Sequence, residues 1–181
     1  MEASKSHGHG SAERDGPIEP TFCPHCGERL KRQRKLDRER PVCEACHYVW
    51  FPDPKVGVAA IVVRDDALLL VERRYPPEKG KWGLPGGFVD AGEDPAEGAA
   101  REALEETGLE VRIEGLFDVL HNREPGGASI VILYRATACG GELRAGDDAA
   151  AAVFQPLDDL PELAFASTRA VVSALRSGPL G

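Results

Sequence analysis

Three glutamates at helical spacing are the residues of this chain best suited to chemistry. Glu102, Glu105 and Glu106 stand at positions i, i+3 and i+4 of a run that reads as a helix, so they share one face. Like charges on one stripe repel each other. A bound Mg²⁺ or Mn²⁺ would turn that repulsion into attraction, because hard cations prefer carboxylate oxygens. For the helix taken alone, an ordinary solvated acidic face is the alternative.

The loop before this helix favours metal binding. Gly86 and Gly87 end a Leu-Pro-Gly-Gly run, where the backbone can approach a ligand closely because glycine has no Cβ. Such a loop can contribute a carbonyl oxygen to a metal or leave room for a pyrophosphate. Glu93, just ahead of the helix, can hydrogen-bond Arg101 and so fix the direction of Glu102.

The spacing of the whole segment is more specific than the helix alone. Gly87 is followed by five residues and Glu93, then by seven residues and the run Arg101-Glu-Ala-Leu-Glu-Glu-Thr-Gly-Leu. Seven fixed positions, at about 7% usage each, match by chance about once in 10⁸ windows. The segment resembles the signature of the Nudix hydrolases over all 23 positions, with Ala103 where the signature has a bulkier apolar residue.

This resemblance implies metal-assisted hydrolysis of a phosphoanhydride bond in a nucleoside diphosphate linked to another moiety. It implies that Arg101 and Glu93 orient Glu102. The general base is open between Glu102 and a later loop containing Asp147 and Asp148, for which a solvated acidic pair is the alternative. The implied Mg²⁺ or Mn²⁺ ligands are the Gly87 carbonyl and the carboxylates of Glu102, Glu105 and Glu106.

The sequence specifies the substrate less closely than it specifies the reaction. Gly86, Gly87 and Trp82 are candidate substrate-binding residues; Trp82 and Phe88 flank the glycine loop and could stack on a base, with core burial as the alternative. The Ser-Gln-Pro-Trp-Pro-Phe-Pro stretch of the NADH pyrophosphatase branch is absent, which disfavours NADH. The segment 156–168 is similar to the branch that acts on ADP-ribose or FAD, and simple packing of Leu163 and Phe165 is the alternative there.

Four of the five cysteines form two tight pairs near the N-terminus. Cys23 and Cys26, then Cys43 and Cys46, give C-x2-C, sixteen residues and C-x2-C, a spacing that suits tetrahedral Zn²⁺. A redox pair is the alternative. A site closed by four sulfurs predicts structural zinc, and the segment resembles the zinc ribbon ahead of some Nudix domains. Cys139 stands alone and is interpreted as a buried or bystander thiol.

A basic run separates the two cysteine pairs. Residues 29–40 carry seven bases and two acids, so a nucleic-acid contact is one interpretation. Interspersed aromatic residues are absent from the run, which favours a solvated hairpin. A non-catalytic, nucleotide-sensing Nudix module with a nucleic-acid-binding ribbon is therefore the alternative function. The three intact glutamates with Arg101 favour an enzyme instead.

Composition bounds the location and the partners. The 181 residues include 30 acids and 22 bases, a net charge of −8 that argues against a chain devoted to nucleic acid or anionic membranes. The apolar runs are too short to cross a bilayer, and the N-terminus lacks the apolar core of a signal peptide. We therefore expect a cytoplasmic enzyme with a small nucleotide substrate and no membrane partner. Many Nudix enzymes are dimers, so the resemblance favours a homodimer.

The elements that must position the glutamates are predicted from the hydrophobic pattern and from turn-forming and helix-capping residues. A disordered tail at 1–20, a zinc ribbon at 21–52 and a Nudix domain at 55–178 are predicted, with Pro52-Asp-Pro54 at the second boundary. Two β-rich runs flanking Asp65-Asp66 predict a hairpin. The expected fold class is α/β, a Nudix α/β/α sandwich around a mixed sheet. The further expected elements are strands at 110–120, 130–137 and 151–155 and helices at 95–107 and 167–176, with Asp94 and Ser167 as N-caps and Gly108 as a C-terminal stop.

Overall fold

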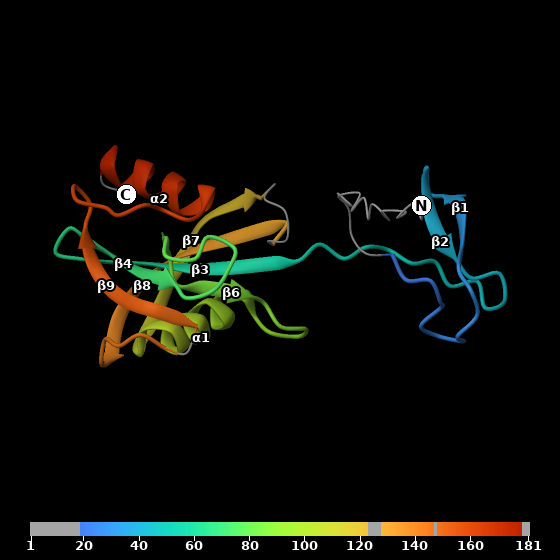
Figure 1. The fold of residues 1–181 in the computed structure, drawn as a ribbon, viewed down its shortest axis with the longest axis horizontal. Helices are drawn as coiled ribbons and strands as arrows, with labels where there is room; N and C mark the ends of the chain where they lie inside the picture. The colour runs from blue at the N-terminus through green and yellow to red at the C-terminus, as the bar shows by residue number, and fades with distance from the viewer. Residues whose placement is uncertain (1–18, 123–127, 147, 179–181) are drawn as a thin grey trace, which may run out of the picture. The chain divides into compact units, whose positions relative to one another are not determined.

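The computed structural model describes residues 19–122, 128–146 and 148–178 (Figure 1). Contacts divide the chain into two compact units, Met1–Asp53 and Pro54–Gly181. Apart from its last two residues, the tail predicted at 1–20 lies outside the described residues. Among the described residues, no helix is long and apolar enough to cross a membrane.

The first unit is built on one antiparallel hairpin. Strand β1 (Lys31–Lys35) pairs with β2 (Arg38–Val42), and Leu36 and Asp37 between them have φ values of 49° and 63°. Most side chains of both strands are exposed. The basic run therefore forms a solvated hairpin between the two cysteine pairs.

The second unit begins with the hairpin expected from the sequence. Strand β3 (Val56–Arg64) and β4 (Ala67–Arg73) pair in antiparallel fashion. Asp65 and Asp66 join them with φ values of 50° and 60°, as a two-residue turn that follows the twist of the strands requires.

A mixed sheet of seven strands forms the middle of this unit. Its main order is β5-β4-β3-β8-β7, with β6 paired to β3 and β9 paired to β4, and the β3–β8 pairing is parallel. The glycine-rich segment at 79–92 carries two short strands, because Trp82–Gly83 pairs with β4 and Gly86–Phe88 pairs with β3. The remaining strands are β5 (Trp82–Gly83), β6 (Gly86–Phe88), β7 (Leu109–His121), β8 (Ile130–Gly141) and β9 (Ala149–Pro156).

Two helices cover opposite faces of the sheet (Figure 1). Helix α1 (Pro95–Thr107) packs over a core that includes Leu69, whereas α2 (Ala166–Arg176) packs over one that includes Leu68 and Leu70. Neighbouring residues of β4 are thus buried on both faces, because each face has its own helical layer. The predicted α/β sandwich around a mixed sheet is confirmed.

Both ends of α1 follow the sequence prediction. The Asp94 side chain accepts hydrogen bonds from the backbone N–H groups of Ala96 and Glu97, and Gly108 ends the helix at φ 70°. The Leu104 side chain is 46% exposed, so it does not form the contact face of the helix. Fully buried Ala99 and Ala103 line the contact face instead, as expected where a helix lies close to a sheet.

The predicted cap of α2 is wrong. Phe165, in extended conformation, is the N-cap residue and makes no side-chain capping bond, while Ser167 lies inside the helix. The backbone sets this start, because the N–H of Ala164 donates to the carbonyl of Trp82 and fixes the chain on β5 just before the helix.

Candidate active site

Two glycines of β6 allow this strand to lie between β3 and α1. Gly86 pairs with Ala59, and a Cβ on Gly86 would lie 2.8 Å from the Ala59 Cα. A Cβ on Gly87 would lie 2.5 Å from the Cδ of Glu102. No larger residue fits at either position without displacing its neighbours, so the Gly87 backbone is held directly against the Glu102 carboxylate.

Arg101 connects the acidic residues. Its Nε and Nη2 donate to the two carboxylate oxygens of Glu93, at 2.7 and 3.1 Å. Its Nη1 donates to Glu102 at 2.8 Å and to Glu105 at 3.0 Å. Its Nη2 also donates to the carbonyl of Phe88 at 3.2 Å, which connects the helix to the end of β6. The Glu93–Arg101 contact expected from the sequence is present and bidentate.

The carboxylates differ in their electrostatic surroundings. The hydrogen bonds from Arg101 lower the pKa of Glu93 to about 2. Burial raises the pKa of Glu106 to about 7, against the hydrogen bond that the Gly86 N–H donates to it at 2.8 Å. Burial also raises the pKa of Glu102, opposed by Arg101. These two half-buried carboxylates would be stabilised by a cation placed between them.

Glu102 and Glu106 line a common cleft of about 330 Å³ with Gly86, Gly87 and Asp148. Glu105 does not line it, because its side chain is 56% exposed and bound to Arg101. In the described ranges, these three glutamates do not gather their oxygens as closely as the four cysteines gather their sulfurs. The structure therefore brings together two of the three expected carboxylates and leaves the third at the rim.

Of the two aspartates considered as an alternative base, Asp148 is the one whose position is described. It lines the cleft of Glu106, and its charge contributes to the raised pKa of Glu106, after burial and the Glu102 charge. The N–H of Gly146 donates to the carbonyl of Glu106 at 3.0 Å, which ties this loop to the end of α1. Asp147 lies outside the described residues.

A second cleft of about 650 Å³ adjoins the first. Trp82 lines neither of the two, because its side chain packs against the core beneath α2. Phe88, the other aromatic residue of the glycine loop, is 46% exposed and lines both clefts. Phe165, from the segment 156–168 for which simple packing was the alternative, lines both as well. The residues shared by both clefts are Arg73, Leu84, Gly86, Gly87, Phe88 and Phe165.

The pKa of Glu106 predicts a pH-dependent stability in magnesium-free buffer. A folded-state pKa of about 7, above the ordinary 4.5, means that the contribution of Glu106 to stability is fully present below pH 4.5 and is lost as pH rises through 7. Relative to Glu106→Gln, the wild type should lose about 3 kcal/mol of unfolding free energy between pH 4.5 and 8. Urea unfolding of both proteins at several pH values measures this difference, and parallel pH profiles would contradict it.

The four N-terminal cysteines converge in the first unit. Their sulfur atoms lie within 4.8 Å of one another, with separations of 3.4 to 3.5 Å for three pairs. These separations are far longer than a disulfide bond and close to the roughly 3.8 Å between sulfurs at the corners of a ZnS₄ tetrahedron. The residues present therefore fit a zinc ion.

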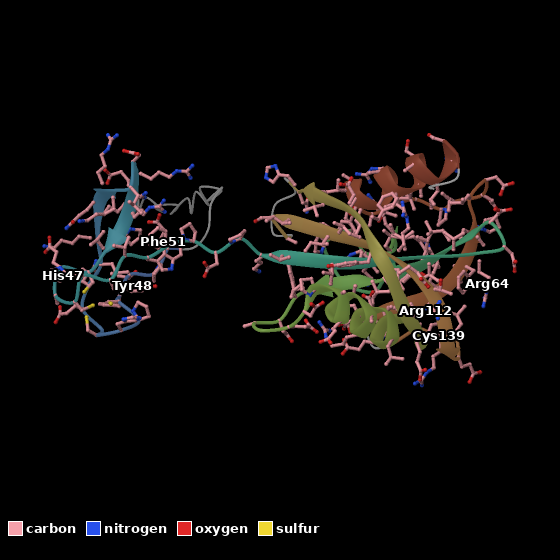
Figure 2. All side chains as sticks on the ribbon, turned by 180° about the vertical axis from the view of Figure 1, so that it is seen from behind. His47, Tyr48, Phe51, Arg64, Arg112 and Cys139 are labelled. Atoms are coloured by element: carbon pink, nitrogen blue, oxygen red, sulfur yellow. The ribbon has the colours of Figure 1, made fainter. Side chains whose placement is uncertain are left out.

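The two cysteine pairs have matching backbones. The N–H of Cys23 donates to the carbonyl of Glu28, and that of Cys43 to the carbonyl of Tyr48, at 2.7 and 2.8 Å. Gly27 has φ 77° after the first pair, and His47 has φ 62° after the second. His47 (Figure 2) thus adopts the left-handed conformation that glycine would adopt more easily. The turn around each cysteine pair, here called a knuckle, therefore has the same backbone geometry in both pairs.

A mixed sheet between two helices, with a glycine strand held against half-buried helical carboxylates, is the arrangement expected of a Nudix domain. Residues 53–175 match the family model described as NUDIX domain, and the chain belongs to the Nudix family. It is a Nudix hydrolase, carrying its four-cysteine cluster ahead of the hydrolase domain.

Similar proteins include several with named activities. An ADP-ribose pyrophosphatase of Methanocaldococcus jannaschii is 40% identical over 131 residues, covering 71% of this chain and 78% of that protein. A putative 8-oxo-dGTP diphosphatase of Mycobacterium tuberculosis is 41% identical over 95 residues, covering 51% and 67%. A Nudix hydrolase from Nitrosomonas europaea has a TM-score of 0.78 at 28% identity and covers 88% of this chain and 94% of its own. That coverage exceeds the second unit alone and extends into the first.

Proposed function

We propose that this protein hydrolyses a phosphoanhydride bond in a nucleoside diphosphate linked to another moiety, using Mg²⁺ or Mn²⁺, and that its substrate is ADP-ribose or FAD. The observation that carries the reaction is the cleft in which the half-buried Glu102 and Glu106 lie beside the backbone of Gly87. The ADP-ribose pyrophosphatase of M. jannaschii supports the choice of substrate.

The metal would be held by hard oxygen ligands. The Glu102 and Glu106 carboxylates and the Gly87 carbonyl would provide them, and Glu105 would join after releasing Arg101. When bound, the ion polarises the phosphoryl oxygens and neutralises charge that develops during hydrolysis. The absence of a Cβ on Gly87 is what allows the backbone and the carboxylate to face the same small space.

The other roles fall to protein groups around the metal ligands. Arg101 holds Glu102 in place through Nη1, and is itself fixed by the bidentate contact with Glu93. The Gly86 N–H holds Glu106. A proton from the attacking water would pass to Glu102 or to the loop of Asp147 and Asp148, of which Asp148 lines the cleft. The cysteine cluster would hold a structural zinc ion in a ribbon at 21–52.

A turnover panel tests this proposal. Full-length protein with Mg²⁺ or Mn²⁺ is offered ADP-ribose, FAD, NADH, CoA, dinucleoside polyphosphates and nucleoside triphosphates, and products are separated by chromatography. We expect kcat/KM for ADP-ribose or FAD to exceed that for NADH by about tenfold or more, equivalent to about 1.4 kcal/mol. Hydrolysis of none of these, with nucleotide binding retained, would indicate a nucleotide sensor and overturn the proposal.

A further inference from the structure

Arg73 stands where the two clefts meet. It ends β4 and lines both the cleft of the glutamates and the larger neighbouring cleft. The pairing of β4 with β9 shifts register between Glu72 and Arg73. A register shift of this kind redirects the side chain at a strand end. Here it lies at the end of β4, where Glu72 and Arg73 line the cleft of the glutamates.

The guanidinium of Arg73 is held from two directions. Its Nε donates to the carbonyl of Pro77 at 2.7 Å, and its Cζ lies 4.9 Å from the centre of the Phe165 ring. In the part of the chain that the structure describes, neither of its Nη atoms forms a hydrogen bond or an ion pair. Both Nη groups of a planar, oriented fork, with four N–H donors between them, therefore remain for a ligand.

The other cations of the larger cleft are already engaged. Lys81 forms ion pairs with Glu78 at 2.5 Å and with Glu162 at 2.9 Å. Arg169 donates to the carbonyl of Leu163 at 2.9 Å. Arg73 also acts electrostatically on the buried Glu106, so its positive charge lies within range of the candidate metal ligands.

We propose that Arg73 binds the diphosphate of the substrate, holding the phosphoryl group that is not attacked at the junction of the two clefts. The reacting phosphoryl group would lie on the side of Glu102 and Glu106, and the nucleoside would occupy the larger cleft. A guanidinium fork matches two phosphate oxygens, which a lysine in this position would contact as a point charge. This inference rests on the proposed function, because it assigns the phosphate-bearing substrate to these clefts.

Binding of two simple probes tests the assignment without catalysis. ADP and inorganic pyrophosphate are titrated calorimetrically into full-length, zinc-loaded protein in magnesium-free buffer at low salt. We expect Arg73→Gln to weaken both probes by about tenfold or more, as loss of a charge-assisted contact predicts. Arg73→Lys should recover part of the loss, because it restores charge but not the fork.

The matched control is Arg64→Gln. Arg64 also stacks on an aromatic ring, that of Phe154 at 3.8 Å, but it ends β3 and lines neither cleft (Figure 2). The affinity of the Arg64→Gln variant for ADP and for pyrophosphate should stay within about twofold of the wild type. If Arg73→Gln fails to fold, judged by thermal unfolding, the Arg73→Lys variant decides the test by its affinity.

Three outcomes would overturn the inference. The first is unchanged affinity in the Arg73 variants, and the second is a wild type that binds neither probe. The third is weaker binding of ADP with unchanged pyrophosphate, which would assign Arg73 to the nucleoside through Phe165. Hydrolysis of ADP-ribose together with any of these defeats this inference alone. Arg73-dependent binding without hydrolysis of any substrate defeats the proposed function alone.

Discussion

Glu106→Gln is expected to lower Mg²⁺-dependent turnover by about 10³-fold or more, about 4 kcal/mol in activation free energy, while the protein folds normally. Glu106 is the most deeply buried carboxylate of the cleft, and its pKa of about 7 shows how poorly the protein alone stabilises its charge. A cation supplies the missing stabilisation. The neutral amide keeps the size of the side chain but offers the metal a much weaker ligand.

The fold should tolerate this substitution. The side-chain carbonyl oxygen of the introduced amide can still accept the hydrogen bond that the Gly86 N–H now donates to Glu106, and a neutral amide is cheaper to bury than a carboxylate. Turnover of ADP-ribose, circular dichroism and thermal unfolding are measured together.

Glu97→Gln provides the matched control. It makes the same chemical change in the first turn of α1, on an exposed side chain outside the cleft, and should keep near-wild-type turnover. Glu105→Gln should fall between the two, because Glu105 lies at the rim. Near-wild-type turnover by Glu106→Gln would refute the assignment of Glu106 as a metal ligand.

The parts of the site that were predictable from the sequence are local. Glu93, Arg101 and Glu102 lie within ten residues of one another, so helical geometry and spacing suffice to bring them into contact. The β3–β4 hairpin follows similarly from two β-rich runs around the turn residues Asp65-Asp66, whereas the order of the strands in the sheet was not predicted.

The other parts depend on contacts between distant segments. Arg73 and Phe165 are 92 residues apart, and they meet because the start of α2 is fixed on β5. Strand β5 has only two residues, and the face that it turns inward places the Trp82 side chain against the core. Neither a short strand nor a tertiary stacking contact has a periodic pattern that sequence reasoning could read.

The basic hairpin gives a related example. Its run contains no aromatic residue, yet the guanidinium of Arg40 lies 4.5 Å from the ring centre of Phe51, and that of Arg29 lies 5.6 Å from Phe22. The rings come from flanking segments and reach the hairpin only in the folded unit. Interspersed aromatic residues in the sequence are therefore an incomplete guide to stacking partners on a small hairpin.

Cys43→Ser is expected to abolish zinc binding and unfold the first unit while leaving the second unit folded. The structured part of that unit is too small to build a sufficient core of its own. Buried Cys43 belongs to the second cysteine pair, and its sulfur is 3.4 Å from that of Cys26 in the first pair. The N–H of Cys46 lowers the pKa of Cys43 to about 7, which favours the thiolate that a metal requires.

Cys139→Ser provides the control for this change, because Cys139 lies on β8 of the second unit (Figure 2) and is not one of the four clustered cysteines. Elemental analysis should find about one zinc per chain in the wild type and in Cys139→Ser, and less than about 0.1 in Cys43→Ser. Hydrogen exchange should show loss of protection in residues 21–52 of Cys43→Ser, with residues 55–178 unchanged, because each unit holds most contacts internally. Less than half a zinc per wild-type chain would refute the structural zinc, and protection retained in metal-free Cys43→Ser would show that the ribbon folds without it.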